Sequence, residues 1–260
     1  MVSGEDAIVD VKDLEIGYAG ESVLRDVTFS VKKGEAVTIL GASGCGKSTL
    51  LKSMIGLLPP RRGVIRIAGR ELDSEGPPAW IREKVGVLFQ SGALLGGYTT
   101  AENVALPIRE LTRLPRNLID RVVQIKLDLV RLGDKGRLPP SELSGGMKRR
   151  AALARAMALD PEVLFCDEPA AGLDPETARQ MDELLVELNV NVGITLVVVS
   201  HEIGTIENIS SRCIMLDAEA RGIIATGAPD ELLQSDDPRV KRFFRRRLDG
   251  RTEDVTHAQN

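Results

Sequence analysis

A glycine-rich loop between a buried strand and a helix limits the fold more than any other feature of this sequence. The strand is the β-branched run 35–40, the loop is GASGCGKST at 41–49, and a helical pattern follows to about residue 55. Glycines let backbone N–H groups turn inward around phosphate oxygens, and the helix adds its positive N-terminal end. Lys47 can place a full charge at the β- and γ-phosphates, and the Ser48 hydroxyl can bind Mg²⁺. The pattern therefore predicts a phosphate-binding loop, and a glycine turn that merely caps a helix explains less of it.

The rest of the chain has the pattern of an α/β core with two further units. Residues 8–31 alternate apolar and polar side chains around glycine turns, which is typical of antiparallel strands. Buried strands recur at 163–166 and 194–199 with helices between them, and this order favours a mostly parallel sheet covered by helices. From about residue 92, prolines and long helical stretches replace the strands. We expect a helical subdomain at about 92–155, inserted in the core.

Composition excludes several classes of function. The chain has 260 residues, a formal net charge of -4 and only 3% aromatic residues, which argues against a nucleic-acid partner. Its cysteines, Cys45, Cys166 and Cys213, are widely spaced and form no CxxC pair, so a disulfide framework or zinc site is not expected. The wholly apolar run 196–199 is four residues long and none is longer, whereas a membrane span needs about 20. We expect a protein without its own membrane span, which can still lie beside a membrane.

An acidic pair supplies partners for the phosphate loop. Asp167 follows the apolar residues 163–166 and therefore lies at the carboxyl end of a buried strand, where open α/β sheets bind ligands. Glu168 can act as the general base that takes a proton from attacking water. A strand that ends in Asp-Glu can also be a plain surface turn, and the phosphate loop is what favours the catalytic interpretation.

The segment LSGGM at 143–147 is a second candidate anion site. Ser144 can cap the alanine-rich helix that follows, and Gly145 and Gly146 allow a close approach of backbone to a ligand. An ordinary capped helix would have the same residues. The segment alone therefore leaves both interpretations open.

Taken together, five motifs in this order resemble the ATP-binding subunit of ABC transporters: GASGCGKST, LSGGM, VLFCDEP, the turn AGLD at 171–174, and the strand end Ser200-His201. The resemblance covers residues 8–235. It implies a P-loop NTPase core within an ATP-binding domain at 1–240, followed by a basic tail at 241–260. It also implies ATP and Mg²⁺ as cofactors, and a head-to-tail dimer in which each ATP lies between the loop of one copy and residues 144–146 of the other.

The resemblance gives each matching residue a role. Lys47, Gln90, Glu168 and His201 would be catalytic, with Gln90 touching Mg²⁺ and the attacking water and His201 orienting Glu168. Mg²⁺ would be held by Ser48, Gln90 and Asp167. The residues that bind ATP directly would be Tyr18, Gly41, Ala42, Ser43, Gly44, Cys45, Gly46, Lys47, Ser48 and Thr49.

Three of these assignments carry further detail. Tyr18 would stack on the adenine, and its alternative is an aromatic side chain in the core of a strand. Asp174 would cross the dimer interface. Ser144, Gly145 and Gly146 would bind the nucleotide held by the partner copy.

Details of three segments narrow the resemblance to ATPases of Mla-type systems, which move phospholipids, and to the related toluene-tolerance and Mce-associated ATPases. LSGGM is followed by Lys-Arg-Arg, Gln90 is followed by SGALL at 91–95 and TTAENVALP at 99–107, and the tail reads DPRVKRFF at 237–244. The resemblance implies that a helix of the membrane permease docks at 90–107. The resemblance implies an ATPase that drives an integral membrane permease in phospholipid transport. It would work as a pair of identical copies at the cytoplasmic face of the inner membrane, with room for small accessory subunits.

Other interpretations remain at this stage. The chain could be a soluble ABC ATPase of translation or repair, an ABC ATPase for a different substrate, or a silent regulatory subunit. The presence of Lys47, Glu168 and His201 argues against the silent form. The basic and apolar tail around Phe243 and Phe244 could touch an anionic membrane or a partner subunit, or form a solvated helix.

Overall fold

The first of the two sheets is antiparallel and comes from the N-terminal part of the chain. The computed structural model describes residues 7–18, 20–72 and 76–244. The strands β1 (Ala7–Tyr18), β2 (Glu21–Lys32), β4 (Arg62–Ile67) and β5 (Arg70–Glu71) form this sheet in the order β2-β1-β4-β5. Burial alternates over most of β2, as the period-two pattern predicts, and register shifts interrupt the alternation along β1. The expected antiparallel unit at 8–31 is confirmed.

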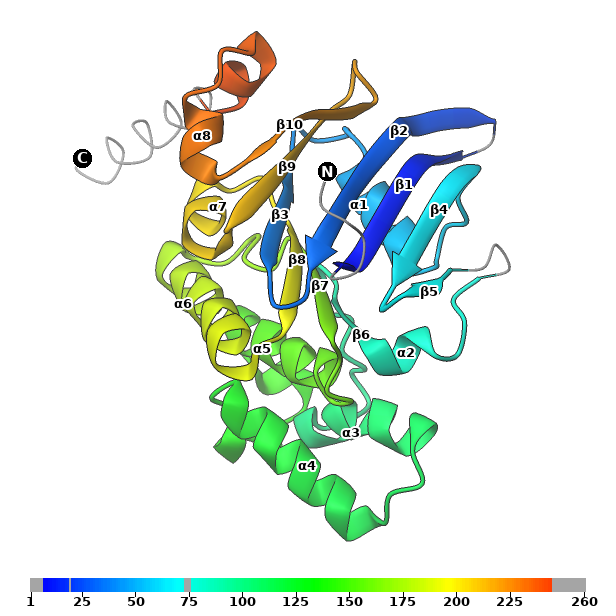
Figure 1. Ribbon diagram of the computed structural model, residues 1–260. Helices are drawn as coiled ribbons and strands as arrows, with labels where there is room; N and C mark the ends of the chain where they lie inside the picture. The colour runs from blue at the N-terminus through cyan, green and yellow to red at the C-terminus, as the bar shows by residue number, and fades with distance from the viewer. Residues whose placement is uncertain (1–6, 19, 73–75, 245–260) are drawn as a thin grey trace, which may run out of the picture.

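The second sheet has six strands and is mostly parallel (Figure 1). Its order is β10-β9-β3-β8-β7-β6, from β3 (Ala36–Leu40), β6 (Val85–Leu88), β7 (Val163–Asp167), β8 (Thr195–Val199), β9 (Arg212–Asp217) and β10 (Gly222–Gly227). Only β10 pairs antiparallel, with β9. All residues of β3 and β8 are buried, which is typical of parallel strands covered on both faces. The predicted α/β core is thereby confirmed.

Helices cover this sheet on both sides. The helix α1 (Lys47–Met54) contacts strands of both sheets, so Leu50 and Leu51 join the two sheets in one apolar cluster. The short helix α2 (Ile81–Lys84) precedes β6. The helix α6 (Pro175–Glu187), which ends in a π-helical turn (Leu188–Val192), packs against α7 (Ile203–Ile209), and α8 (Pro229–Leu233) follows β10.

A helical unit lies at the end of the molecule opposite α8 (Figure 1). It consists of α3 (Thr100–Leu111), α4 (Arg116–Leu129), two 3-10 turns (Gly133–Lys135 and Pro140–Glu142) and α5 (Gly145–Ala156). The helix α3 begins at a reciprocal capping box between Thr99 and Glu102. One apolar cluster joins these helices to Leu88, Leu164 and Leu196 of the sheet. Because the core runs through both units, the division at about 92 and 155 stays a prediction.

The last described residues pack on the core. Val240, Phe243 and Phe244 are buried against Leu40 and Met215, and the two phenylalanine rings meet edge to face at 5.3 Å. Arg245, Arg246 and Arg247 of the expected basic tail lie outside the described residues. Within the described ranges, no helix combines the length and the apolar content that crossing a membrane requires.

Candidate functional site

The glycine loop links the buried strand β3 to the first turn of α1. Gly46, the residue before α1, has φ 104°, and a Cβ there would lie 2.9 Å from Cγ of Leu24. At Gly41 a Cβ would lie 2.4 Å from the carbonyl oxygen of Leu216. Both positions therefore require glycine, because a side chain would collide with its neighbours. Gly46 also has a backbone conformation with positive φ that favours glycine. The tight packing holds the backbone of the loop over the start of α1, where N–H groups lack partners within the helix.

The ammonium group of Lys47 is folded back over this loop. Its Nζ donates to the carbonyl oxygens of Gly41 at 2.8 Å and Ala42 at 3.1 Å, and the residue is buried. A buried ammonium at the start of a helix is a suitable partner for phosphate oxygens. The loop residues predicted to bind ATP thus form one continuous cradle, and their contacts with the nucleotide stay a prediction.

Two oxygen ligands suited to Mg²⁺ meet beside the cradle. Ser48 Oγ donates to Oδ1 of Asp167 at 3.3 Å, which joins the start of α1 to the end of β7. Burial and then the charge of Glu168 raise the pKa of Asp167, while the Ser48 hydrogen bond and Lys47 oppose this shift. A divalent cation would relieve the crowding of two adjacent carboxylates, so these residues fit Mg²⁺. Across the described ranges no cluster of three or more acidic, histidine or cysteine ligands occurs, so the remaining ligands would be phosphate, water or Gln90.

The carboxylate of Glu168 is held by a histidine from the neighbouring strand. Oε1 of Glu168 lies 2.5 Å from Nδ1 of His201, and Glu168 is buried. Its backbone N–H donates to the carbonyl oxygen of Val199 at 2.8 Å, and its φ of 49° turns the chain sharply after β7. The hydrogen bond fixes the orientation of the carboxylate, as an acid–base group in a site requires.

Sheet register places Gln90, the fourth predicted catalytic residue, at the same end of the sheet as Glu168. Leu88 of β6 pairs with Cys166 of β7, and Cys166 pairs with Val198 of β8. Gln90 and Glu168 each follow their paired residue by two positions, on strands that lie about 4.8 Å apart. Gln90 is exposed at this edge. The structure therefore brings Gln90, Glu168 and His201 to one edge of the sheet.

The LSGGM segment forms a capped helix start, as its residues allow. The hydroxyl oxygen of Ser144 accepts the N–H of Met147 at 3.3 Å and caps α5. Gly146 packs so closely that a Cβ would lie 2.3 Å from Cγ2 of Thr177 at the start of α6. Ser144 and Gly145 are exposed. In the described part of the chain, no hydrogen bond or ion pair joins 144–146 to the phosphate loop, so binding of the partner's nucleotide stays a prediction.

Two further predicted residues lie at the surface. Asp174 caps α6 by accepting the N–H of Thr177 at 3.0 Å, and the hydrogen bonds of Thr177 lower the pKa of Asp174. Tyr18, at the end of β1, is 48% exposed, so its interpretation as a core aromatic is wrong. Stacking of Tyr18 on adenine and the interface role of Asp174 stay predictions.

The three cysteines are free and buried. Burial raises the pKa of Cys45 in the loop, and it also raises that of Cys213 to about 11 and that of Cys166. They therefore behave as small apolar side chains, as expected.

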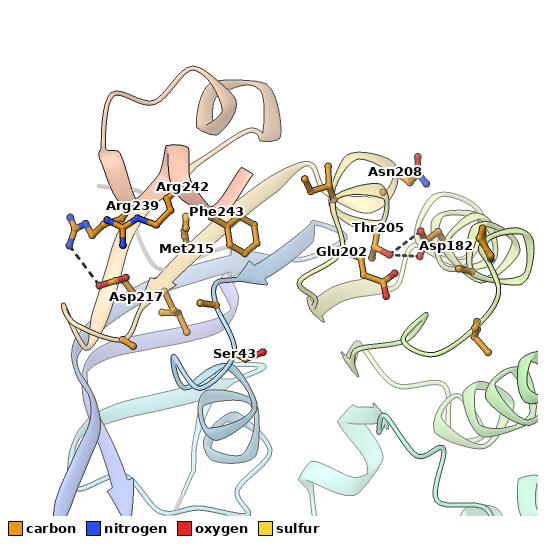
Figure 2. Close-up of a pocket in the computed structure, with 18 of the residues that line it drawn as sticks. Ser43, Asp182, Glu202, Thr205, Asn208, Met215, Asp217, Arg239, Arg242 and Phe243 are labelled. Carbon is orange, nitrogen blue, oxygen red and sulfur yellow. Dashed lines mark hydrogen bonds and ion pairs between the residues drawn. The ribbon is translucent and has the colours of Figure 1, made fainter. Parts of the chain in front are cut away.

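A cleft of about 1020 Å³ opens beside the phosphate loop (Figure 2). It is bounded by Ser43 of the loop, by Asp182 and Thr205 of α6 and α7, and by Arg239 and Arg242 near the C-terminal end. Lys47, Ser48 and Asp167 do not line it. The cleft therefore adjoins the phosphate site without containing its charged groups.

One buried residue near the site has no role in the sequence-based assignments. The guanidinium of Arg149 on α5 donates to the carbonyl oxygens of Phe89, Gln90 and Ala171, and Ala171 lies three residues after Glu168. A signal was present in the sequence, because Arg149 shares a helix face with Gly145, Ala152 and Leu153 at helical spacing.

Comparisons with known proteins agree with this site. The family model described as ABC transporter matches residues 24–171. The intermembrane phospholipid transport system ATP-binding protein MlaF of Haemophilus influenzae is 41% identical over 94% of this chain and 92% of its own length. The probable ribonucleotide transport ATP-binding protein mkl of Mycobacterium leprae is 38% identical over 93% of this chain and 70% of its own length.

Two solved structures have the same fold. One is cbiO1 from Clostridium perfringens, described as part of the ABC transporter complex cbiONQ, with a TM-score of 0.81, 29% identity, and coverage of 98% of this chain and 99% of that one. The other is a dimer of the ATP-binding cassette MJ0796 in a post-hydrolysis state bound to ADP and Pi, with a TM-score of 0.76, 29% identity, and coverage of 85% and 98%. Sequence, fold and the arrangement of the loop, the acidic pair and the histidine agree, and the chain belongs to the ABC transporter family of ATP-binding proteins.

Proposed function

We propose that this chain hydrolyses ATP between two copies of itself and thereby drives phospholipid movement by an integral membrane permease. One observation carries the catalytic part of the proposal. The carboxylate of Glu168 is hydrogen-bonded to His201. Glu168 directly follows Asp167, which forms the Mg²⁺-suited pair with Ser48 at the end of the sheet where the phosphate loop begins. ABC ATPases use ATP with Mg²⁺, and this edge offers groups of the right chemistry for both.

The chain's own residues would divide the reaction among them. The loop N–H groups and Lys47 bind the phosphates, and Ser48, Asp167 and Gln90 hold Mg²⁺, which supplies charge neutralisation when bound. Glu168 accepts a proton from water as the water oxygen bonds to the γ-phosphorus and the bond from that phosphorus to the β-γ bridging oxygen breaks. ADP and phosphate leave, and the proton returns to solvent. Such transfer depends on positioning and charge stabilisation more than on covalent chemistry by the protein.

His201 would act on the base and on the phosphate. The hydrogen bond between its Nδ1 and Oε1 of Glu168 would hold the carboxylate in one orientation. The His201 side chain is 31% exposed, and its Nε2 would contact the γ-phosphate.

The dimer follows from two separate anion-binding segments in one chain. Among the described residues, no hydrogen bond or ion pair joins 41–49 to 144–146, although both segments offer backbone N–H groups at the start of a helix. ABC cassettes dimerise, and an inverted second copy would place each 144–146 segment over the other copy's loop. Asp174 is exposed at the start of α6.

An apolar groove supports the expected permease contact. It has a volume of about 280 Å³ and lies between β6 and α3, lined by Phe89, Pro107, Leu111 and other residues. Leu95 and Tyr98 are exposed on the adjoining segment at 42% and 40%. Such a surface would accept a helix from the permease, and this contact would hold the chain at the cytoplasmic face of the inner membrane, with room for accessory subunits.

Phospholipid as the transported substrate is supported by the MlaF relative, which matches along nearly the full length of both chains. The name of the mycobacterial relative instead points to ribonucleotides, so that substrate is the second candidate. Translation or repair functions have no comparable support, because the family relatives named above are transport proteins.

The test is purification of the tagged chain from detergent-solubilised membranes together with its integral partner, followed by reconstitution into phosphatidylethanolamine–phosphatidylglycerol vesicles. ATP-dependent movement of a fluorescent phospholipid, lost with Glu168→Gln, supports the proposal. Movement of a labelled ribonucleotide without lipid movement would replace the substrate. Co-purification with ribosomes or DNA and no integral partner would refute the transport role.

A further inference from the structure

A buried arginine on α5 contacts the two segments that carry the proposed catalytic groups. Arg149 is 9% exposed, and one guanidinium nitrogen donates to the carbonyl oxygen of Phe89 at 3.1 Å and to that of Gln90. The other nitrogen donates to the carbonyl oxygen of Ala171 at 3.2 Å. A single planar group therefore joins the end of β6 to the turn after β7.

Each contact lies very near a proposed catalytic side chain. Gln90 itself provides one of the carbonyl oxygens. Ala171 in turn donates its N–H to the carbonyl oxygen of Glu168 at 3.2 Å, so the Arg149 contact holds the turn that begins at Glu168. A shift of Arg149 would therefore move the backbone on both sides of the reacting groups.

The energetics of Arg149 favour a geometric role over a stabilising one. Burial lowers the pKa of the Arg149 guanidinium, and among the described residues no carboxylate forms an ion pair with it. A buried charge that meets only neutral carbonyl groups is a costly way to stabilise a fold, compared with an apolar side chain of similar size. What the guanidinium offers in return is a rigid fork that spans two separate segments.

Arg155, two turns further along the same helix, provides a matched comparison. Its guanidinium donates to Ala93 at 2.7 Å and Gly92 at 2.9 Å, again to backbone carbonyl oxygens. It therefore contacts the loop after Gln90, and among the described residues it forms no hydrogen bond or ion pair with the turn at 168–171. The two arginines differ in one respect that matters, because only Arg149 spans both segments.

We propose that Arg149 is a positioning residue for ATP hydrolysis, which sets the relative position of Gln90 and Glu168 through the backbone carbonyl groups of residues 89, 90 and 171. The proposal rests on the function proposed above. Arg149 lies on the helix that begins with the LSGGM segment. Binding of that segment to a second copy would therefore shift Gln90 and Glu168 together. Lysine has no planar fork and cannot span both segments in the same way.

The test compares Arg149→Lys with the control Arg155→Lys in the full chain. Misplacement of reacting groups by about 1 Å can cost roughly 10²-fold in rate, so kcat of Arg149→Lys should fall about 10- to 100-fold. KM for ATP and the affinity for a fluorescent ATP analogue should stay within about threefold, because the phosphate loop is untouched. Arg155→Lys should keep kcat within about threefold of the native value, although its melting temperature should fall about as much as that of Arg149→Lys.

A double variant separates positioning from general loss of structure. If Arg149 acts through Gln90, then Arg149→Lys combined with Gln90→Ala should lose less activity than the product of the two single effects. The proposal would be overturned if the activity loss of the double variant equalled the product of the two single losses. It would also be overturned if Arg149→Lys left kcat unchanged, or if Arg149→Lys and Arg155→Lys lowered kcat equally.

Backbone amide exchange makes the test independent of hydrolysis. Arg149→Lys should speed exchange in both 89–93 and 168–173, whereas Arg155→Lys should affect only the first segment. Absence of ATP hydrolysis by the native chain would refute the proposed function, and the exchange result would still decide the contact between segments. Unchanged exchange at 168–173 in Arg149→Lys would refute that contact.

Discussion

Replacing Asp182 by asparagine should stabilise the folded chain, and only at neutral to alkaline pH. Asp182 lies on α6 and is 3% exposed, and Oγ1 of Thr205 on α7 donates to both of its carboxylate oxygens at 3.1 Å. Burial, which is the largest cause, and the nearby Glu202 carboxylate raise its pKa to about 6, against the hydrogen bonds of Thr205 and Asn208. The ionised carboxylate is thus held in a place that favours the neutral acid.

The sign follows from the raised pKa. In the unfolded chain Asp182 ionises near its ordinary value of 3.8, and in the folded chain near 6. The contribution of the neutral Asp182 to the free energy of unfolding is therefore fully present below about pH 4, and it is lost as the pH rises through about 6. One pKa unit corresponds to about 1.4 kcal/mol, so the ionised group costs the folded state up to roughly 3 kcal/mol above pH 7.

The asparagine variant should recover part of this cost. Its amide keeps the shape and one acceptor for Thr205 but must still satisfy its own N–H groups, so we expect a gain of about 1–3 kcal/mol near pH 8. Near pH 4 the gain should shrink to well below 1 kcal/mol, because the native acid is then largely protonated. Urea unfolding at about pH 8 and about pH 4, on either side of the sequence pI of 5.5, measures both values.

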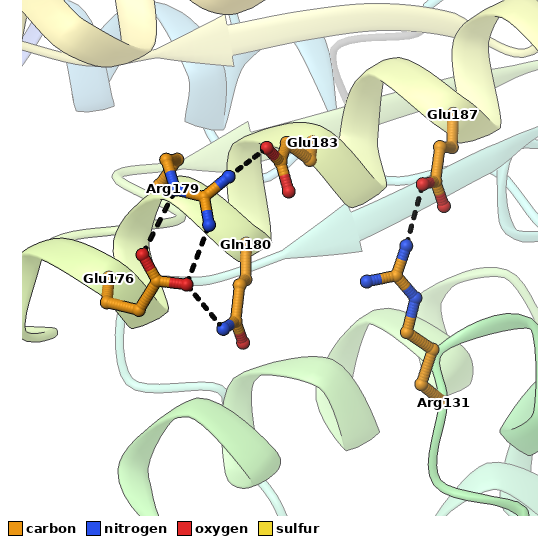
Figure 3. A network of polar contacts seen from close by, with 6 residues as sticks. All are labelled: Arg131, Glu176, Arg179, Gln180, Glu183 and Glu187. Carbon is orange, nitrogen blue, oxygen red and sulfur yellow. Dashed lines mark hydrogen bonds and ion pairs between the residues drawn. The ribbon is translucent and has the colours of Figure 1, made fainter.

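Glu183 on the same helix gives the control. It is exposed and forms an ion pair with Arg179, which also contacts Glu176 (Figure 3). Exposed ion pairs contribute little to stability, so Glu183→Gln should change it only slightly at either pH. A destabilised Asp182→Asn variant at pH 8, or a gain of equal size at both pH values, would refute the reasoning from burial.

Three further outcomes test the site and the packing around it. Glu168→Gln should lower ATP turnover by roughly 10²–10⁴-fold and accumulate an ATP-bound dimer in size-exclusion chromatography, and unchanged hydrolysis would remove Glu168 from the role of base. Lys47→Ala should lower turnover by roughly 10²-fold or more even at saturating ATP, since it removes the charge beside the phosphates, and near-normal activity there would contradict this role. Burial acts to raise the pKa of Glu35, but the hydrogen bonds and charge of Arg212 outweigh it and lower the pKa. Arg212→Ala should therefore lower unfolding stability by roughly 1–3 kcal/mol at pH 7, with the loss shrinking toward pH 4, and a pH-independent loss would show that the charge pair is not its cause.

The parts of the structure that could be predicted from the sequence depend on short-range patterns. The loop at 41–49, the buried strands 163–166 and 194–199 and the capping role of Ser144 each follow from residues that are neighbours in the chain. Hydrophobic periodicity and helix capping act over a few residues, and the structure agrees with them.

Features that depend on distant contacts were not predicted. Asp182 occupies a buried position on α6 where an apolar residue is expected, and only the approach of Thr205 from α7 explains how it is accommodated. The role of Arg149 depends on carbonyl groups about 20 and 60 residues away. The ion pair between Arg131, after α4, and Glu187, at the end of α6, likewise joins the helical unit to the core (Figure 3). No local pattern in the sequence contains such pairs.

The meeting of the catalytic side chains at one end of the sheet depends both on local sequence patterns and on contacts between distant strands. Each strand end could be found in the sequence, but Gln90, Glu168 and the end of β8 come together only because β6, β7 and β8 are neighbours in one particular register. Successive side chains on a strand face opposite ways, so a slip of β7 by one residue would bring Glu168 to the place of Asp167 and Pro169 to the place of Glu168. The base would then lie where Ser48 meets its acidic partner, and His201 would lose its carboxylate. The buried residues of β7 oppose such a slip, since Val163, Leu164, Phe165 and Cys166 fill two different apolar clusters on the two faces of the sheet. The hydrophobic packing of this strand therefore sets which acid binds metal and which acid can accept the proton.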